Sequence, residues 1–483
     1  MTKEGARRGA LNSCWLAWQK VRGHDLDEAG WSDDVDTFVS PKSTHTFIAG
    51  DNEVCATLSL DVQTGPGRYA IIAARFLHTK TEGEQMQRST DRILTSHAGS
   101  LHGTPAMIEL MKEQRPGTAP GPEFADRVKA GVADVVRLQK ENGVDVVNDG
   151  EYTKGLLLGW MTYARTRLGG VEERPLKPGE AAGNQSITAR EERSFPEYFA
   201  ANRQGGAGSF ASTAVYATGP LSYTGQAATQ RDIEYLKAGM QAAGVTEGFL
   251  SALAPATIEH WLRDDYYHDD EKFIYAIAEA MHEEYKAIAD AGIIVQLDDP
   301  GLPDGFQIHA DMSVPEYKRF LELRIEATNH SIRDIPEELV RLHMCWGSSH
   351  HPHTQDLPLS EIIDLVYKVK AQCYSIEAAN PQHEHEWAVF KDHPLPNGKI
   401  LMPGILGHCA REFVEHPEAV AQRLERYASV VGKENVIGGT DCGFAQSPFA
   451  QRVHPSIMWA KLRSLAEGAR LATAELWGKS RAA

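Results

Sequence analysis

Four residues in the second half of the sequence have the side chains and spacing to hold a metal ion. His343 and Cys345 lie two positions apart in the run HMCWG, and Glu377 and Cys442 follow later. Side chains two apart on a β-strand point to the same side, so His343 and Cys345 can face one ion. One imidazole, one carboxylate and two thiolates form a donor set that suits tetrahedral Zn²⁺. The pattern therefore predicts a zinc site made by His343, Cys345, Glu377 and Cys442.

A His-x-Cys pair is a weak signal when it stands alone, because a buried cysteine beside a hydrogen-bonded histidine is the commoner arrangement. The chain has six cysteines and no export signal, which does not indicate a disulfide framework. We interpret the four cysteines outside the predicted zinc site as ordinary residues: Cys14, Cys55, Cys373 and Cys409.

The predicted ligands need elements that bring them together, and the pattern of strands and helices supplies such a frame. Short apolar runs alternate with long amphipathic segments about eight times over roughly 400 residues, which is typical of a (β/α)₈ barrel. The candidate strands are Ile93–His97, Val144–Asn148, Thr213–Thr218, Phe249–Leu253, Ile293–Leu297, Val340–Cys345, Cys373–Glu377, Ile400–Leu406 and Asn435–Thr440. The clearest candidate helices are Glu123–Glu141, Asp270–Ala291, Pro315–Ser331, Leu359–Val369 and Pro417–Val431.

Nine candidate strands are one too many for the barrel, so we expect the one near 213 or the one near 249 to belong to an insertion. A doubly wound open sheet is the alternative fold, disfavoured because no Gly-rich phosphate loop follows an early strand. Active sites of (β/α)₈ barrels lie at the carboxyl ends of the strands. His, Cys, Asp and Glu gather at these predicted strand ends, which indicates a functional rim.

Residues 1–85 differ from the rest of the chain because they show no sustained helical period. Two stretches there, Glu53–Val62 and Tyr69–Phe76, are candidate strands. We therefore predict an N-terminal extension of unknown role over 1–85 and the barrel over 86–483. Two interpretations of the extension stay open. It is either a genuine segment, disordered or structured, or an untranslated stretch that precedes a natural start at Met86.

The overall composition excludes several classes of protein. The net charge of −17 argues against a nucleic-acid binder, since phosphate backbones are held by clustered Lys and Arg. No apolar stretch approaches the roughly 20 residues that span a bilayer, and the N-terminus lacks the pattern of a secretory signal. We expect a cytoplasmic enzyme that acts on small molecules and has neither nucleic-acid nor membrane partners.

Five dispersed motifs resemble the cobalamin-independent methionine synthase family, in the order that its catalytic barrel has them. They are VVNDGEYTKG at 146–155, QLDDPGL at 296–302, HMCWG at 343–347, SIEAAN at 375–380 and TDCGF at 440–444. The likeness covers about residues 90–478 and includes the family's short single-barrel relatives, among them epoxide:coenzyme M transferases. It implies a zinc ion on the same four residues, His343, Cys345, Glu377 and Cys442.

The resemblance also implies roles for other strand ends. The HAGS segment matches the loop that holds the amino-acid carboxylate, through Gly99 and Ser100. Glu151 and Asp298 match the acids that hold the substrate ammonium, and His408 matches a histidine that assists proton transfer, a role that Asp298 could share. No counterpart exists for the cluster His350, His351 and His353, which we interpret as a rim loop.

These residues predict a thiol alkyltransferase. A thiol with a pKa of about 8.5 is mostly protonated at neutral pH, and coordination to Zn²⁺ deprotonates it while it stays nucleophilic. Two thiolates and a carboxylate would neutralise the metal charge, which favours alkyl transfer to sulfur over hydrolysis.

The leading interpretation is a methyltransferase of methionine biosynthesis, with S-methyl transfer to homocysteine or a similar thiol. The methyl donor, a methyl-folate or another compound, is open because TGPLSYTGQ keeps the family's Gly219 and Pro220 without a nearby Trp. Two alternatives remain. One is a zinc-dependent epoxide:thiol transferase of the coenzyme M type, and the other is a metal-independent decarboxylase or lyase on the same barrel.

Overall fold

The computed structural model describes residues 43–48, 55–61, 70–77, 86–113, 122–156, 160–176, 188–204, 213–347, 351–408, 412–445 and 453–478. The chain divides into two compact units, Met1–Gln85 and Met86–Ala483. In the first unit, β1 (Ser43–Ile48), β2 (Cys55–Asp61) and β3 (Ala70–Leu77) form an antiparallel sheet in that order. β2 and β3 overlap the two candidate strands. The assignment of 1–85 as an N-terminal extension, translated or not, stays a prediction.

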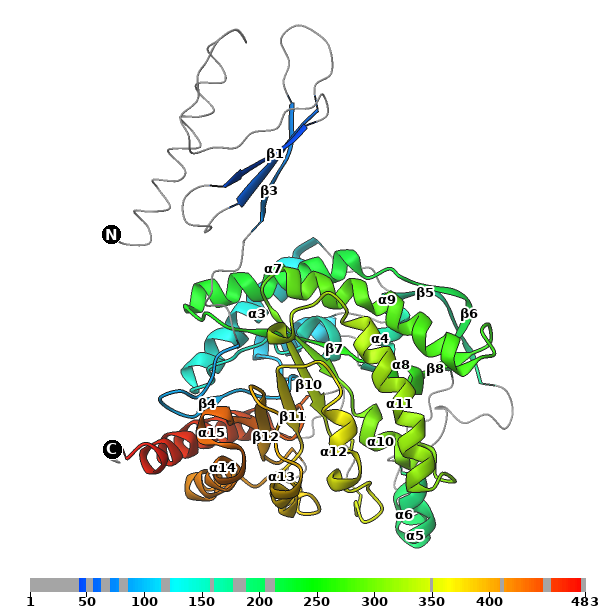
Figure 1. The fold of residues 1–483 in the computed structure, drawn as a ribbon, viewed down its shortest axis with the longest axis vertical. Helices are drawn as coiled ribbons and strands as arrows, with labels where there is room; N and C mark the ends of the chain where they lie inside the picture. Colours follow the sequence, from blue (N-terminus) through cyan, green and yellow to red (C-terminus); the bar gives the residue numbers. More distant parts are fainter. Residues whose placement is uncertain are drawn as a thin grey trace, which may run out of the picture. The chain divides into compact units, whose positions relative to one another are not determined.

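Seven parallel strands form the main sheet of the second unit (Figure 1). Their spatial order is β4 (Leu94–Thr95), β13 (Ile437–Thr440), β12 (Ile400–Leu406), β11 (Cys373–Ile376), β10 (Val340–Met344), β9 (Ile294–Asp298) and β7 (Phe249–Leu253). The strands β7, β9, β10, β11, β12 and β13 are buried throughout, as expected for parallel strands covered on both faces.

The segment 144–148 occupies the eighth position and closes the ring. The backbone N–H groups of Asp145 and Val146 donate to the Thr95 carbonyl of β4 at 3.0 and 3.1 Å. On the other side, Phe249 N of β7 donates to the Val147 carbonyl at 2.9 Å. Only one isolated bridge, Val147 to Gly248, marks this segment as strand-like. The predicted (β/α)₈ barrel is confirmed.

Helices surround the ring of strands (Figure 1). The long ones are α3 (Pro122–Glu141), α7 (Gln226–Ala243), α9 (Asp270–Asp290), α11 (Val314–Ser331), α14 (Pro417–Val431) and α15 (Pro455–Leu476). Shorter ones are α2 (Pro105–Glu113), α4 (Trp160–Arg167), α5 (Ala189–Ser194), α6 (Pro196–Gln204), α8 (Pro255–Trp261), α10 (Gly301–Ile308), α12 (Leu359–Val366) and α13 (Val389–Asp392). A π-helical turn, η1 (Tyr152–Leu156), and three 3₁₀ turns, η2 (Glu337–Leu339), η3 (Glu384–Ala388) and η4 (Lys433–Asn435), complete the set. None of the helices in these residues is long and apolar enough to cross a membrane.

A second, three-stranded sheet accounts for the surplus candidate strand. It consists of β5 (Leu168–Pro175), β6 (Thr213–Tyr223) and β8 (Leu262–Asp264), with β6 in the middle. The candidate Thr213–Thr218 lies in β6 and is the insertion, whereas Phe249–Leu253 is a barrel strand. Gly219 and Pro220, the remnant of the folate segment, also lie in β6.

An apolar cluster lies inside the barrel toward the amino ends of the strands. One buried cluster draws residues from seven of the eight ring positions, together with Met86: Leu94, Val146, Phe249, Ile294, Cys373, Ile400, Met402 and Ile437. These residues lie early in their strands or midway along them, so the cluster fills the interior below the carboxyl ends. Cys373 is therefore a core residue, as the sequence predicted. Cys14 and Cys409 lie outside the described residues.

Candidate metal centre

Three of the four predicted ligands meet at the carboxyl end of the barrel. His343 is in β10, Cys345 follows that strand directly, and Cys442 follows β13. One donor atom from each of the three lies within 4.8 Å of the other two, and all three residues are buried. Cys345 donates a hydrogen bond to Cys442, with 3.8 Å between the sulfur atoms. We call His343, Cys345 and Cys442 the donor triad.

The geometry of the donor triad fits a tetrahedral zinc ion. Two thiolates at about 2.3 Å from a tetrahedral Zn²⁺ lie about 3.8 Å apart, which is the separation found here. His343 Nδ1 forms a hydrogen bond of 3.0 Å with Ser375 Oγ, while its Nε2 is buried without a hydrogen-bond partner among the described residues. A metal-binding histidine commonly has one nitrogen oriented by an outer partner and the other left for the ion.

The two sulfur atoms have different acidities. The hydrogen bond that Cys345 donates lowers the pKa of Cys442 well below its usual value. The same bond, together with burial, raises the pKa of Cys345. The pair therefore already resembles a thiolate beside a thiol, which is half of the ionisation that a metal would complete.

Glu377, the fourth predicted ligand, lies in a neighbouring group. It follows β11, and its Oε2 accepts a hydrogen bond from Trp346 N at 2.8 Å while Oε1 accepts one from Asn380 Nδ2 at 2.9 Å. Its carboxylate lies within 4.8 Å of donor atoms of His408 and Asp441, and all three residues are buried. The structure thus brings His408 next to Glu377, while Glu377 is not among the three donors that converge.

Asp441 is a site residue to which the sequence analysis gave no role. Its Oδ1 accepts hydrogen bonds from Ala378 N at 2.7 Å and Ala379 N at 2.8 Å, whereas its buried Oδ2 has no partner among the described residues. Burial and the nearby Glu377 carboxylate raise the pKa of Asp441 well above its usual value. The signal that could have found it is its position at the end of β13, beside Cys442.

The two acids predicted to hold an ammonium group are both buried at the same end of the barrel. Glu151 adopts a left-handed backbone conformation with φ of 57°, rare for a residue with a side chain. A Cβ atom at Gly99 would collide with the Glu151 carboxylate, so only glycine fits there. The absence of a side chain at Gly99 therefore leaves space for Glu151, which the sequence analysis assigned to the same site.

Burial dominates the ionisation of both acids. It raises the pKa of Glu151 well above its usual value, and the charge of Asp298 raises it further. Burial also raises the pKa of Asp298, to about 7. Because each acid disfavours the charge of its neighbour, a cation placed against both would be attracted to the site. A substrate ammonium group is such a cation.

Lys154, the nearest basic residue in sequence, is engaged elsewhere. Its ammonium group donates a hydrogen bond to the Ser251 carbonyl and lies 3.8 Å from Glu284 Oε1. Glu284 also pairs with Arg167 at 3.2 Å. These charges form a buried network behind the acids.

Ser100 connects the HAGS loop to the loop that carries Cys442. Its carbonyl accepts a hydrogen bond from Phe444 N at 2.8 Å, and its hydroxyl oxygen accepts one from Ala445 N at 3.3 Å. A Cβ atom at Gly443 would collide with the Ser100 side chain. Ser100 is therefore next to the donor triad.

The histidine-rich segment after Trp346 forms hydrogen bonds with acids. His353 Nδ1 contacts Asp356 Oδ2 at 2.6 Å, and His383 contacts Asp356 at 3.2 Å and Glu386 at 2.8 Å. Burial acts against charge on His383, but these two hydrogen bonds outweigh it and raise its pKa to about 10. We call His353, Asp356, His383 and Glu386 the rim network.

The remaining histidines of this segment add little to a metal site. Donor atoms of His351, His353 and Asp356 also lie within 4.8 Å of one another, but His351 Nδ1 accepts a hydrogen bond from His353 N at 3.2 Å. His350 lies outside the described residues.

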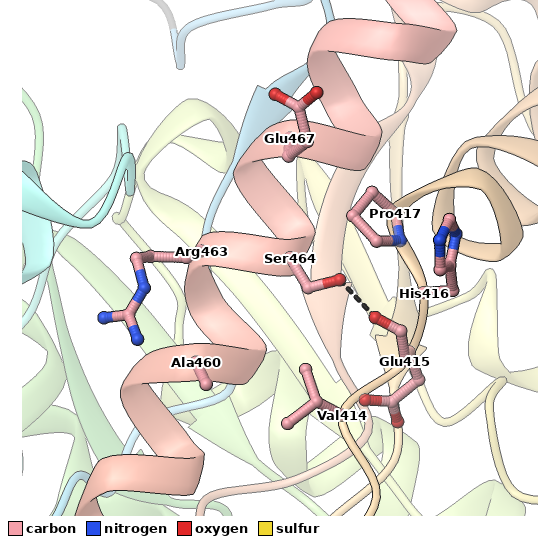
Figure 2. Close-up of a pocket in the computed structure, with 8 residues that line it drawn as sticks. All are labelled: Val414, Glu415, His416, Pro417, Ala460, Arg463, Ser464 and Glu467. Carbon is pink, nitrogen blue, oxygen red and sulfur yellow. Dashed lines mark hydrogen bonds between the residues drawn. The ribbon is translucent and has the colours of Figure 1, made fainter.

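A surface pocket between the start of α14 and α15 lies apart from these groups (Figure 2). Its lining includes none of the predicted site residues. Glu415, one of the lining residues, connects the pocket wall to the loop before His408: its Oε1 accepts a hydrogen bond from Gly407 N at 2.9 Å and its Oε2 one from Lys461 Nζ at 2.8 Å. The pocket is therefore linked to the loop before His408 through Glu415.

Comparison with known proteins places this site in a family. Residues 240–460 match the family model described as "Cobalamin-independent synthase, Catalytic domain". A 5-methyltetrahydropteroyltriglutamate–homocysteine methyltransferase of Thermotoga petrophila is 25% identical over 356 residues, which is 72% of this chain and 41% of that protein. An uncharacterised protein of Bacillus subtilis is 24% identical over 383 residues, 76% of this chain and 91% of that one.

The chain thus spans less than half the length of the methyltransferase, but it is close in extent to shorter relatives. A solved B12-independent methionine synthase from Shewanella, in complex with selenomethionine, shares the fold with a TM-score of 0.59 and 20% identity. The match covers 80% of this chain and 99% of that one. The resemblance that the five motifs predicted is confirmed: residues 240–460 of this chain match the model of a cobalamin-independent synthase catalytic domain.

Proposed function

We propose that this chain is a zinc-dependent thiol alkyltransferase that transfers a methyl group to the sulfur of homocysteine. The observation that carries the proposal is the convergence of the donor triad at one end of the barrel that also holds the buried acids Glu151 and Asp298. A thiol and an ammonium group on one small molecule would satisfy both sets. The names of the relatives support the same reaction.

The residues that would hold the ion are the donor triad, with Glu377 as the fourth ligand. Bound Zn²⁺ would supply the positive charge that keeps a substrate thiol ionised and nucleophilic at neutral pH. Because Glu377 in this structure accepts hydrogen bonds from Trp346 and Asn380, its carboxylate is held beside the triad. It is therefore the ligand that a substrate sulfur would replace most easily.

The other site residues would orient the substrate and move protons. Glu151 and Asp298 would hold the ammonium group, and the loop of Gly99 and Ser100 would receive the carboxylate. His408 is buried in the group with Glu377 and Asp441, where it could donate a proton to the leaving group of the methyl donor. Asp298, with its pKa of about 7, is the second candidate for that proton.

The experiment is a screen of thiols against donors on zinc-loaded protein. The thiols are homocysteine, 4-mercaptobutyrate, which lacks the amino group, and 2-mercaptoethanesulfonate. The donors are a methyl-tetrahydrofolate, a methylsulfonium compound and an epoxide. Formation of methionine from homocysteine with either methyl donor is the expected result.

Two other results would each replace the proposal. Product formed only from 2-mercaptoethanesulfonate and the epoxide would assign the coenzyme M type of reaction. That reaction would need a cation for the sulfonate, and Lys154 is directed at Glu284 instead. Purified protein with less than about half an equivalent of zinc, active in a decarboxylase or lyase assay after chelation, would assign the metal-independent class.

A further inference from the structure

A guanidinium group is buried inside the barrel, and the carboxylates of the described residues act on it only from beyond ion-pair distance. Arg341 lies in β10 and is 2% exposed. Within the part of the chain that the structure describes, no carboxylate is at ion-pair distance from it. Its guanidinium carbon lies 3.8 Å from the centre of the Phe249 ring, and its Nη1 donates to Ser96 Oγ at 3.1 Å. Burying a charge without a close ion pair costs free energy, so a functional role for Arg341 is worth considering.

The strongest contact of Arg341 is with an amide. Arg341 Nε donates to Gln296 Oε1 at 2.7 Å. A guanidinium group can only donate hydrogen bonds, so it fixes the orientation of the amide: the oxygen faces Arg341, and Nε2 must face the opposite side. The orientation of Gln296 is therefore set by Arg341 and cannot be reversed without loss of this bond.

On its other side, Gln296 contacts three groups of the proposed substrate site. Nε2 lies 2.7 Å from Asp298 Oδ1, 2.6 Å from the Ala98 carbonyl and 3.2 Å from Ser251 Oγ. Ser251 in turn forms a hydrogen bond with Glu151. The Ala98 carbonyl precedes Gly99 in the loop predicted to hold the substrate carboxylate. One amide thus reaches Asp298 directly, Glu151 through Ser251, and the loop through its backbone.

We propose that Arg341 and Gln296 are a positioning pair that aims Asp298, Glu151 and the Gly99 loop at the amino-acid end of the substrate. The pair makes the site selective for thiols that carry an ammonium group, and this role rests on the proposed function. Arg341 places a positive charge behind the two acids, and Gln296 transmits its orientation to them. Neither residue touches the substrate.

The test compares homocysteine with 4-mercaptobutyrate in Gln296→Met and Arg341→Met. Loss of a hydrogen bond to a charged group corresponds to about a tenfold to a hundredfold change in affinity. We expect KM and Kd for homocysteine to rise by that factor, with kcat and the values for 4-mercaptobutyrate within about threefold of wild type. Bound zinc, measured by elemental analysis, should be unchanged.

Two further variants separate orientation from packing. Gln296→Glu keeps a partner for Arg341 but cannot donate to Asp298, so it should lose at least as much selectivity as Gln296→Met. Gln307→Met is the matched control, because Gln307 is also buried and its amide also donates to an aspartate, Asp356, at 3.1 Å. It should leave the preference for homocysteine as it is in wild type.

The possible outcomes of these experiments distinguish the positioning pair from the proposed methyl transfer. Wild-type protein that prefers homocysteine, with the same preference in both Gln296 variants, would overturn the positioning pair and leave the function standing. Binding preference for homocysteine that is lost in the variants, in a protein that makes no methionine, would support the pair and overturn the proposed reaction. Wild-type protein that binds both thiols equally would overturn the pair together with the ammonium site.

Discussion

The donor triad and the rim network are linked through Trp346, and each contains buried histidine: one in the triad and two in the rim network. Trp346 follows Cys345 directly, and its ring stacks on His383 with 3.8 Å between centroids. In the rim network, Asp356 contacts two histidines, and His383 contacts two acids. In the donor triad, His343 lies against Cys442, its Nε2 is buried without an ordinary hydrogen bond among the described residues, and the two sulfur atoms are 3.8 Å apart.

The difference lies in the donors and their partners, and it supports the donor triad, not the rim network, as the proposed metal centre. A buried polar atom without a partner carries a free-energy cost unless something fills the gap. The rim network has already paired its charges, so an ion would have to displace those bonds. The donor triad has two soft sulfur donors beside an imidazole, and an ion would bind all three in place of their contacts with one another.

The largest expected effect comes from Cys442→Ser. A hard hydroxyl is a poor substitute for a thiolate, so zinc should be lost and turnover should fall by more than the roughly 100-fold typical of losing an outer partner. The barrel should stay folded, because Cys442 lies at the rim of the sheet. Elemental analysis, turnover and circular dichroism measure the three quantities; full zinc content and an unchanged rate would remove Cys442 from the ligand set.

His353→Asn is the matched control from the rim network. If the comparison is right, it keeps the zinc content of wild type, because the rim network holds no ion. Loss of metal from this variant would show that the rim network is a metal site.

Glu151→Gln should have the next largest effect, and it contrasts the acids of the rim network, which form hydrogen bonds with histidines, with Glu151, which lies beside the acid Asp298. The acids of the rim network already have histidines as hydrogen-bond partners. In the proposed function, Glu151 and Asp298 bind the ammonium group of the substrate instead. The variant should raise KM for homocysteine by about tenfold to a hundredfold, the value of one charged hydrogen bond. KM for 4-mercaptobutyrate should not change. Equal effects on both thiols would exclude homocysteine as the substrate.

Glu191→Gln serves as the control for that change. Glu191 is a buried acid in α5, and its carboxylate accepts a hydrogen bond from Gln355 N at 2.6 Å. This variant should leave the ratio of the two KM values unaltered.

A smaller effect is expected from Ser375→Ala, which removes the partner of His343 Nδ1. Loss of an outer hydrogen bond to a metal-binding histidine typically costs about tenfold to a hundredfold in metal affinity, and we expect the lower end here. Competition with a chelator measures that affinity. Ser331→Ala, another fully buried serine whose hydroxyl bonds only the Thr328 carbonyl at 2.7 Å, should leave it unchanged. An unaltered affinity in Ser375→Ala would mean that this contact does not orient His343.

The smallest effect on activity is expected from His383→Asn, although stability should respond to pH. The pKa of His383 in the folded protein, about 10, lies above its unfolded value of about 6.5. The stabilisation is therefore fully present below pH 6.5 and is lost as pH rises through 10. Urea unfolding should show wild type losing on the order of 2–4 kcal/mol over that range, more than the variant loses. Parallel pH curves for the two proteins would contradict the charged state of His383.

Zinc content of His383→Asn provides the companion measurement. It should equal that of wild type, because His383 contacts Trp346 and not the donor triad.

Residue patterns in the sequence were sufficient to predict the barrel fold and the central residues of the site. Apolar runs of strand length, separated by amphipathic helices, were enough to predict the barrel, because each strand is buried on both faces. The two-residue spacing of His343 and Cys345 predicted their common direction. The segment 144–148 was also predicted as a strand, and it does close the ring. Its pairing is limited to a few backbone bonds and one isolated bridge, which the residue pattern did not reveal.

The sequence by itself determined which elements form and which residues stand at their carboxyl ends, because local periodicity and strand ends are written in the order of residues. Only the tertiary structure decided how those ends group. It placed Glu377 with His408 and Asp441, paired the rim histidines with acids, and set Gln296 between Arg341 and Asp298. Such choices depend on which donors and acceptors meet across strands distant in the chain, and that is fixed by packing around the barrel.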